Sequence, residues 1–247
     1  MKISIKTTKW YEDAYAALII FTRIPFEKCY RPSPESYSRA LAYWPLTGWL
    51  TAAVSAGVLY AADTIVPYQI AVIAAVATRM LLTGAIYEEG MRDFISERTG
   101  RPVYGKAAWV VYELLLFLSL SSLSTDSAVI TIIAAEPFAK MISGQIVQML
   151  PHAPFRHDGK QQIVFSKLST SAGILMFCFG IIPLLGFFYF TSGARWDLIL
   201  FLPCIVMYFL YMLIMKTESG YRNESLSTLF LLNELAVYLV VTLQALL

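Results

Sequence analysis

Residues 172–191 read AGILMFCFGIIPLLGFFYFT, a stretch of twenty residues without a charged side chain. A helix that crosses the hydrocarbon core of a bilayer needs about 20 predominantly apolar residues. Because this stretch meets that requirement, it predicts a transmembrane helix. Six further stretches are predominantly apolar and about as long: 41–62, 66–86, 107–124, 128–150, 197–215 and 228–247. The sequence therefore predicts an all-α polytopic membrane protein with about seven transmembrane helices, in a single integral membrane domain over residues 1–247.

The composition also indicates a membrane protein. Of the 247 residues, 57% are hydrophobic and only 15% are charged, and the mean hydropathy is +0.61. Soluble proteins average about 25% charged residues. The hydrophobicity excludes intrinsic disorder, and a net charge of +2 gives no reason to expect nucleic acid as a partner. The three cysteines form no CxxC pair, which argues against a disulfide framework or a zinc site.

The N-terminal segment contains one apolar stretch that is too short to span a bilayer. Residues Ala14–Phe21 are apolar, with Glu12 and Asp13 before them and Arg23 after them. This arrangement predicts a short N-terminal interfacial or re-entrant helix. We expect no removable signal peptide, because no basic n-region with a cleavage site precedes this stretch. No internal repeat is evident, which disfavours a transporter built from duplicated halves.

The basic residues decide the expected orientation in the membrane. Of the 19 Lys and Arg residues, 16 fall on the side of the N-terminus; Arg195 falls on the other side, and Arg79 and Lys140 lie inside spans. Cytoplasmic loops carry the excess of Lys and Arg. We therefore expect a multi-pass protein of the cell (inner) membrane, with the N-terminus inside and the C-terminus outside. The long polar loops are then cytoplasmic: 22–40, 87–106, 151–171 and 216–227.

The densest acidic segment is YEEGMRDFISE at residues 87–97, where the second predicted span meets the cytoplasm. If the segment is helical, Glu89, Asp93 and Glu97 lie on one stripe at i, i+4 and i+8. Mg²⁺ prefers oxygen ligands and commonly bridges carboxylates to substrate phosphates. The segment therefore predicts phosphoryl transfer, with Glu89, Asp93 and Glu97 as ligands of Mg²⁺. The candidate catalytic residues are Glu88, Glu89, Asp93 and Glu97.

Basic residues lie within and after this acidic segment. Arg92, Arg98, Arg101 and Lys106 could contact phosphate oxygens, since charge-assisted hydrogen bonds to phosphate are strong. The alternative is a solvated loop that contains only local ion pairs.

The predicted spans also contain ionisable residues, namely Arg79, Glu113, Glu136, Lys140 and Glu234. An unpaired charge at the centre of a membrane helix costs about 2.5–3.5 kcal/mol or more, so each should face the bundle interior. Glu136 precedes Lys140 by four residues, the favourable order for an ion pair on one helix. This pair either fixes helix packing or contributes to a site.

The third predicted cytoplasmic loop reads LPHAPFRHDGK over residues 150–160. Arg156 and Lys160 flank a turn at Asp158-Gly159. We interpret this loop as one that binds an anionic group.

Six segments of the chain are similar, in the same order, to the motifs of one family. They are FTRIP (21–25), YWPLTG (43–48), LTGAIYEEGMRD (82–93), AEPFAK (135–140), LPHAPFR (150–156) and GYRNE (220–224). Together they resemble the cobalamin synthases, or adenosylcobinamide-GDP ribazoletransferases. The resemblance implies a membrane-bound, Mg²⁺-dependent phosphotransferase. In that reaction the hydroxyl of α-ribazole, or of its 5′-phosphate, attacks the β-phosphate of adenosylcobinamide-GDP and expels GMP.

The resemblance also implies roles for individual residues. Glu89 and Asp93 match two motif carboxylates and would hold Mg²⁺. The substrate-binding residues that it implies are Arg101, Lys140, Arg156, Tyr221, Glu224 and Glu234. From their place in the charged segments, we expect Arg92 and Asp158 to bind substrate as well. The expected partners are adenosylcobinamide-GDP, α-ribazole or its 5′-phosphate, and the lipid bilayer. A homo-oligomer or a complex with other enzymes of the corrinoid pathway is compatible with the sequence.

The chain differs from the family pattern at several motif positions. Tyr87 replaces a histidine, Arg92 replaces an alanine and Ser96 replaces an aspartate, while Arg222-Asn223-Glu224 stands where the family has TGD. A second hypothesis is therefore a catalytically degenerate relative that binds a corrinoid or nucleotide, or serves as a subunit of a complex. A third is a CDP-alcohol-type phosphotransferase, although no Asp follows Gly100 at the spacing that such enzymes require.

Overall fold

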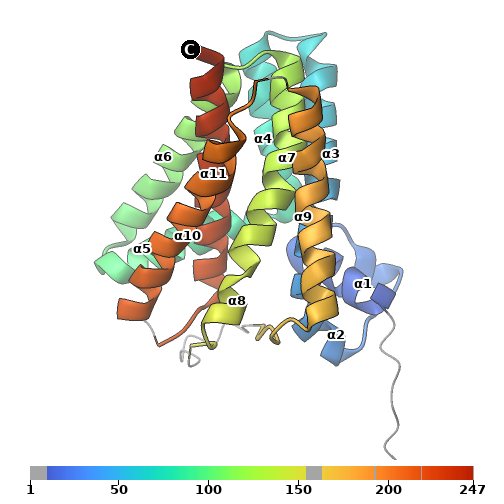
Figure 1. Ribbon diagram of the computed structural model, residues 1–247, viewed down its shortest axis with the longest axis vertical. Coiled ribbons are helices and arrows are strands. Elements are labelled where there is room, and N and C mark those ends of the chain that lie inside the picture. Colours follow the sequence, from blue (N-terminus) through green and yellow to red (C-terminus); the bar gives the residue numbers. More distant parts are fainter. Residues whose placement is uncertain (1–9, 154–162, 192, 218, 247) are drawn as a thin grey trace, which may run out of the picture.

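The computed structural model describes residues 10–153, 163–191, 193–217 and 219–246. Its long helices run up and down along one axis, and the C-terminus lies at the end opposite α1 (Trp10–Phe21) and α2 (Pro34–Arg39) (Figure 1). The long helices are α3 (Trp44–Asp63), α4 (Tyr68–Thr83), α6 (Pro102–Ser121), α7 (Thr125–Gly144), α9 (Thr170–Phe190), α10 (Trp196–Thr217) and α11 (Asn223–Leu246). The described part contains no β-strand beyond one isolated bridge. The prediction of an all-α polytopic membrane protein is confirmed.

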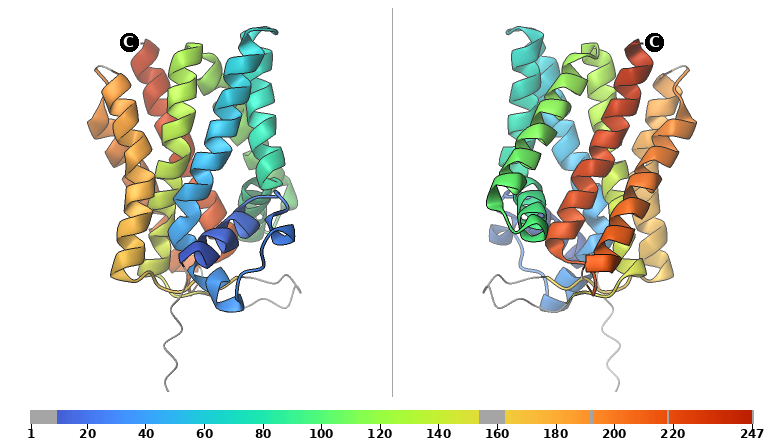
Figure 2. Two further views of the ribbon diagram at one scale, coloured as in Figure 1. Left: turned by 90° about the vertical axis from the view of Figure 1, so that its right-hand side faces the viewer. Right: turned by 90° about the vertical axis from the view of Figure 1, so that its left-hand side faces the viewer.

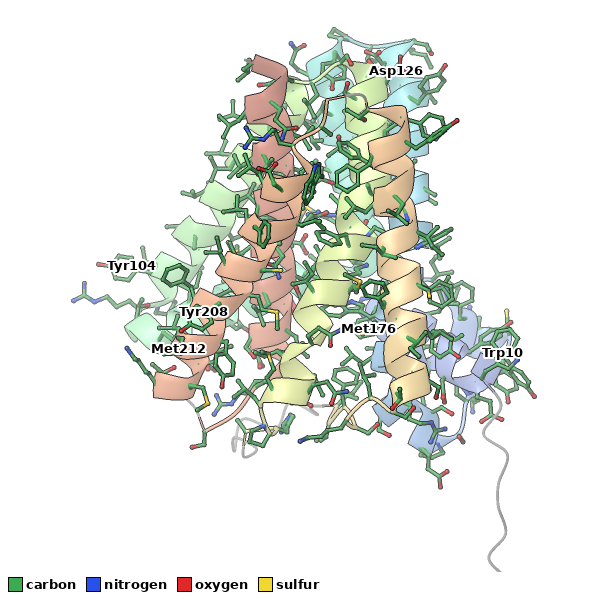
Figure 3. All side chains as sticks on the ribbon, in the orientation of Figure 1. Trp10, Tyr104, Asp126, Met176, Tyr208 and Met212 are labelled. Atoms are coloured by element: carbon green, nitrogen blue, oxygen red, sulfur yellow. The ribbon has the colours of Figure 1, made fainter. Side chains whose placement is uncertain are left out.

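Two of these helices form the centre of the bundle. In their most apolar windows, 78% of the residues around α7 and 83% of those in α11 are buried, against 22% in α9 and 28% in α10. The outer helices expose apolar side chains, such as Tyr208 and Met212 on α10, whereas Met176 of α9 is buried (Figure 3). An apolar surface of this extent is suited to contact with lipid rather than water.

The number of spans agrees with the prediction of about seven. Within the described residues, six helices are long and apolar enough to cross a membrane, or seven if α4 and α5 (Ile86–Thr99) count as one bent span. α4 alone has 16 residues. At 1.5 Å per residue it is about 24 Å long, which is shorter than the hydrocarbon core of about 30 Å.

The predicted polar loop 87–106 is largely helical. It contains helix α5 and the beginning of α6. α5 is not apolar overall, so its sequence resembles that of a solvated loop, but its buried side packs against α6 and α11. The predicted loop 22–40 likewise contains the short helices η1 (Phe26–Lys28) and α2. Most of a short helix's stability comes from such packing, which hydropathy does not report.

The short elements gather at one end of the bundle, which we call the α5 end. α1, α2, α5 and α8 (Ile146–Met149) all lie there (Figure 2). α1 has 12 residues, so the prediction of a short non-spanning helix before the first span is confirmed. Residues 150–153, 163–169 and 219–222, the described parts of the connections from α8 to α9 and from α10 to α11, also lie at this end.

Candidate active site at the α5 end

α5 begins at a sharp bend. Gly84 (φ 66°) and Ala85 (φ 55°) both adopt the left-handed conformation, and the axes of α4 and α5 are inclined by 83°. This conformation costs a non-glycine residue about 1–2 kcal/mol. The backbone N–H of Arg23 donates to the Leu82 carbonyl at 2.6 Å. The Arg23 side chain lies against Gly84, where a Cβ atom would collide with it.

Two glycines hold α5 between its neighbours. A Cβ at Gly90 would lie 2.5 Å from the Ser227 side chain of α11. A Cβ at Gly105 of α6 would collide with Ser96 and with the backbone carbonyl of Arg92. Because only hydrogen occupies these places, α5 lies close to both α6 and α11, and its position is fixed.

Three of the four acidic side chains of α5 face the surface at this end, whereas Glu88 is buried. Glu89, Asp93 and Glu97 lie on one helix, as the spacing predicts. Glu89 is exposed. Arg92 donates to Asp93 Oδ1 from Nε at 3.0 Å and from Nη2 at 2.9 Å, and Arg222 Nη1 lies 3.4 Å from Glu97 Oε2. Two of the three carboxylates therefore have an arginine partner.

These pairings decide how well the carboxylates fit a metal ion. In the described part of the chain, no three His, Cys, Asp or Glu side chains come close enough together to hold one. Mg²⁺ would have to share Asp93 with Arg92 and Glu97 with Arg222. As they lie in the structure, the three side chains do not fit a three-carboxylate metal site.

At this end, the segment after α8 and the segment before α11 are joined by backbone hydrogen bonds. Tyr221 N donates to the Pro151 carbonyl, and Ala153 N donates to the Tyr221 carbonyl, both at 2.9 Å. The Tyr221 hydroxyl donates to the Phe165 carbonyl at 3.1 Å. Burial raises the pKa of Tyr221 to about 12, so this hydroxyl stays protonated at neutral pH. Tyr221 thus ties three segments together.

We call the paired segments around Pro151, Phe165 and Tyr221 the loop layer. A run of aromatic side chains connects it to the bundle. Phe165 stacks on Phe21 with ring centroids 6.0 Å apart, and Phe21 stacks on Trp44 at 5.3 Å. Trp44 Nε1 donates to the Tyr87 hydroxyl at 2.9 Å. Tyr87 is buried, so the residue that replaces the motif histidine contacts the core.

A buried ionic cluster lies deeper in the bundle, behind α5. Arg79 Nη1 donates to Glu234 Oε2 at 2.6 Å, and Arg79 Nη2 donates to Glu88 Oε1 at 3.2 Å. The Tyr112 and Tyr238 hydroxyls donate to the two oxygens of Glu234 at 3.0 and 3.4 Å. We call Arg79, Glu88, Glu234, Tyr112 and Tyr238 the Arg79 cluster. It joins α4, α5, α6 and α11 inside the bundle.

A second buried pair lies on α7. Lys140 Nζ donates to Glu136 Oε1 at 2.7 Å, which confirms the pairing predicted from their spacing. Thr51 of α3 donates to the same oxygen. Lys140 Nζ also lies 5.3 Å from the ring centroid of Tyr87 and 5.2 Å from that of Phe230, within the range of a cation–π interaction.

Comparisons of the sequence with known proteins identify the family to which the chain belongs. The family model CobS, described as cobalamin-5-phosphate synthase, matches residues 13–242. The chain belongs to this family. Similar proteins named adenosylcobinamide-GDP ribazoletransferase include one from Ralstonia pickettii (strain 12J), which is 28% identical over 72% of this chain and 75% of its own length. Another, from Shewanella amazonensis (strain ATCC BAA-1098 / SB2B), is 27% identical over 92% of this chain and 93% of its own. No solved structure matches the chain significantly.

The described residues of the six segments that resemble CobS-family motifs, which in LPHAPFR are 150–153, meet at or near the α5 end. FTRIP contacts the bend at Gly84, and Trp44 of YWPLTG bonds to Tyr87. Gly48 lies against Pro137 of AEPFAK, with 3.1 Å between the place of a Cβ and Pro137 Cα. The backbone pairing of Tyr221 joins the last two segments.

The predicted site residues occupy three environments. Glu89, Asp93, Glu97, Arg92 and Glu224 lie at the α5 end and are partly or fully accessible. Glu88, Lys140, Tyr221 and Glu234 are buried. Arg101 is exposed at the start of α6, where its guanidinium lies 5.9 Å from the Tyr104 ring centroid. Arg156 and Asp158 lie outside the described residues.

Some residues of this region were not singled out from the sequence. Tyr112, whose hydroxyl bonds to Glu234, is one of them; a tyrosine within a span needs a partner for its hydroxyl, which is the available signal. The contact of Arg222 with Glu97 joins residues 125 positions apart, and the sequence carries no signal for it.

Proposed function

We propose that this CobS-family protein transfers adenosylcobinamide phosphate from adenosylcobinamide-GDP to α-ribazole, or to its 5′-phosphate, and releases GMP. The observation that carries the proposal is the meeting of the motif-like segments, from FTRIP to GYRNE, around α5. Relatives that cover most of the chain bear the name of this activity. The fold brings the motifs together at an end that carries accessible acidic and basic groups, which are the groups that phosphoryl transfer uses.

The proposed chemistry assigns one task to each accessible group. The ribazole hydroxyl oxygen forms a bond to the phosphorus that carries cobinamide, the bond from this phosphorus to the GMP oxygen breaks, and GMP leaves. Glu89 is an exposed carboxylate of α5 that, unlike Asp93 and Glu97, has no described arginine partner, so we assign it the proton of the attacking hydroxyl. Arg92 and Arg222 would exchange their carboxylate partners for phosphate oxygens as substrate binds.

Three further expectations belong to this proposal. The α5 end faces the cytoplasm, the protein resides in the inner membrane, and the transferase requires Mg²⁺. The first two rest on the distribution of Lys and Arg. The third rests on the resemblance and on the preference of phosphoryl transfer for a hard cation. The fit of the described carboxylates does not support it.

The test is GMP release by the purified protein in detergent or nanodiscs, supplied with adenosylcobinamide-GDP and α-ribazole. We expect release with Mg²⁺ and its loss with a chelator. Asp126→Asn is the matched control, since Asp126 is an exposed carboxylate at the opposite end of the bundle (Figure 3). No release at any Mg²⁺ concentration contradicts the proposal.

A specific observation favours a second candidate function. The Arg92–Asp93 and Arg222–Glu97 pairs neutralise two of the three α5 carboxylates that were expected to hold Mg²⁺, as expected for a non-catalytic relative that binds a corrinoid or nucleotide. Such a protein would be thermally stabilised by adenosylcobinamide-GDP without releasing GMP. Turnover that Asp93→Ala abolishes excludes this second function.

A further inference from the structure

A cavity lies beside the bend that starts α5, outside every residue assigned above to substrate. It has a volume of about 400 Å³, and residues of α1, the segment 22–28, α4 and α5 line it. Ligand pockets typically have volumes of about 300–1,000 Å³. Its wall combines apolar side chains with charged ones, among them Ile20, Ile86, Arg23 and Lys28.

One of the two cations in the wall of this cavity, Arg23, is held in place. Arg23 is fixed by its backbone bond to Leu82 and by its side-chain contact with Gly84. Within the described ranges, no carboxylate forms an ion pair with Arg23 or Lys28. By contrast, Arg39, Arg79, Arg92 and Arg222 each pair with Asp or Glu. Glu27 is the one acidic lining residue, so the charged wall is net positive.

The cavity adjoins the acidic face of α5. Ile86 lines the cavity and stands three residues before Glu89 and seven before Asp93 on the same helix. Residues at these spacings share one face of a helix. A group held between Arg23 and Ile86 therefore lies within about one helical turn of the accessible carboxylate.

We propose that this cavity binds the nucleoside phosphate portion of the substrate, with Arg23 and Lys28 on its phosphate oxygens and Ile20 and Ile86 against its apolar parts. The identity of this ligand rests on the proposed function, in which a nucleoside monophosphate is the leaving group. Two cations at the leaving phosphate would stabilise the charge that develops there. In this arrangement, the acidic face of α5 lies on the side of the reacting phosphorus opposite the leaving group.

The experiment measures binding of GDP to the purified full-length protein in nanodiscs of neutral lipid, by equilibrium dialysis. Arg23→Gln and Lys28→Gln should each weaken binding about tenfold or more, equivalent to about 1.4 kcal/mol. Arg31→Gln is the matched control, because Arg31 is exposed three residues after Lys28 but does not line the cavity. If Arg23→Gln fails to fold, Lys28→Gln still tests the inference, since Lys28 is exposed and has no described ion pair.

Three outcomes would overturn this inference. The first is unchanged GDP binding in both cavity variants, and the second is an equal loss of binding in Arg31→Gln. The third is a loss of GDP binding when the protein is placed in nanodiscs of anionic instead of neutral lipid, which would assign the cavity to a lipid headgroup. GDP binding needs neither turnover nor α-ribazole. A wild-type protein that binds GDP through Arg23 but releases no GMP contradicts the proposed function alone, and turnover with an unchanged KM in Arg23→Gln contradicts the inference alone.

Discussion

Two ionic regions of this protein, the Arg79 cluster and the surface of α5, differ in their access to water. In the Arg79 cluster the side chains of Arg79, Glu88 and Glu234 are 5%, 2% and 0% exposed. On α5 the side chains of Arg92 and Asp93 are 35% and 25% exposed. A buried ion cannot lose its partner without a large cost, whereas an accessible one can exchange it. We therefore infer that the Arg79 cluster stabilises the fold and that the accessible ion pairs of α5 are available to bind substrate.

The largest expected effect follows from removing the central cation. Arg79→Met leaves Glu88 and Glu234 buried without their cation, which should lower the free energy of unfolding by about 3–5 kcal/mol. Chemical unfolding in detergent, or thermal unfolding if the protein is too unstable to purify, measures the change. Lys106→Met, an exposed cation on α6, is the control and should have little effect.

A compensated variant separates charge from packing at the same place. Combining Arg79→Met with Glu88→Gln and Glu234→Gln removes the stranded charges, so much of the lost stability should return. If the triple variant is no more stable than Arg79→Met, the cluster does not act through its charges and the comparison fails.

The next effect concerns the close approach of α5 to α11. Gly90→Val places a side chain where a Cβ already meets Ser227 at 2.5 Å, and overpacking of this kind costs about 1–3 kcal/mol. Thermal unfolding should register the loss, and turnover should fall as well because α5 is displaced. The matched change Gly57→Val adds the same side chain where no atom lies within 4 Å. An equal loss in both variants would mean that the contact of α5 with α11 is not specific.

A smaller effect is expected at the loop layer. Tyr221→Phe removes the bond to the Phe165 carbonyl, worth about 1 kcal/mol at neutral pH. The folded-state pKa of Tyr221 is raised to about 12 by burial, above the unfolded value of about 10. This contribution is present below pH 10 and is lost as the pH rises through 12. The advantage of the wild type over Tyr221→Phe should therefore shrink over that interval, and an advantage that does not change with pH argues against a protonated, buried Tyr221.

The smallest effect tests the accessible side of the comparison. A double-mutant cycle with Glu97→Gln and Arg222→Gln should give a coupling energy of about 0.2–1 kcal/mol, as expected for accessible ion pairs. The equivalent cycle on Arg79 and Glu234 should give a larger value. Equal couplings in the two regions would remove the distinction between them.

The spans were predictable because apolar length alone determines them. The stretch 172–191 becomes α9, Thr170–Phe190, with a difference of two residues at most at either end. The spacing of Glu136 and Lys140 was sufficient to predict their pair, since both lie on one helix. The spacing of Glu89, Asp93 and Glu97 was compatible with a helix in the polar loop 87–106, but it could not show that Gly90 and Gly105 allow α5 to lie against other helices. Hydropathy carries no information about such contacts.

The site was predictable only in part, for the same reason. The stripe of Glu89, Asp93 and Glu97 follows from helical spacing. The partners of Glu97 and Glu234, which are Arg222 and Arg79, lie 125 and 155 residues away. Sequence spacing cannot give contacts of that separation. It was the fold that showed which carboxylates are buried and which are accessible.

The most direct test of the central claim is GMP release by Glu89→Gln and Asp93→Asn, measured together with thermal unfolding. The account predicts that release falls about 10²-fold or more in Glu89→Gln, as is typical when a general base is removed. Release should also fall in Asp93→Asn, because Asp93 holds Arg92 on the same face of α5. The unfolding temperature of both variants should stay within the range of the Asp126→Asn control. Unchanged release in both variants, or a loss of release that follows a loss of stability, would contradict the claim that the accessible face of α5 carries the reaction.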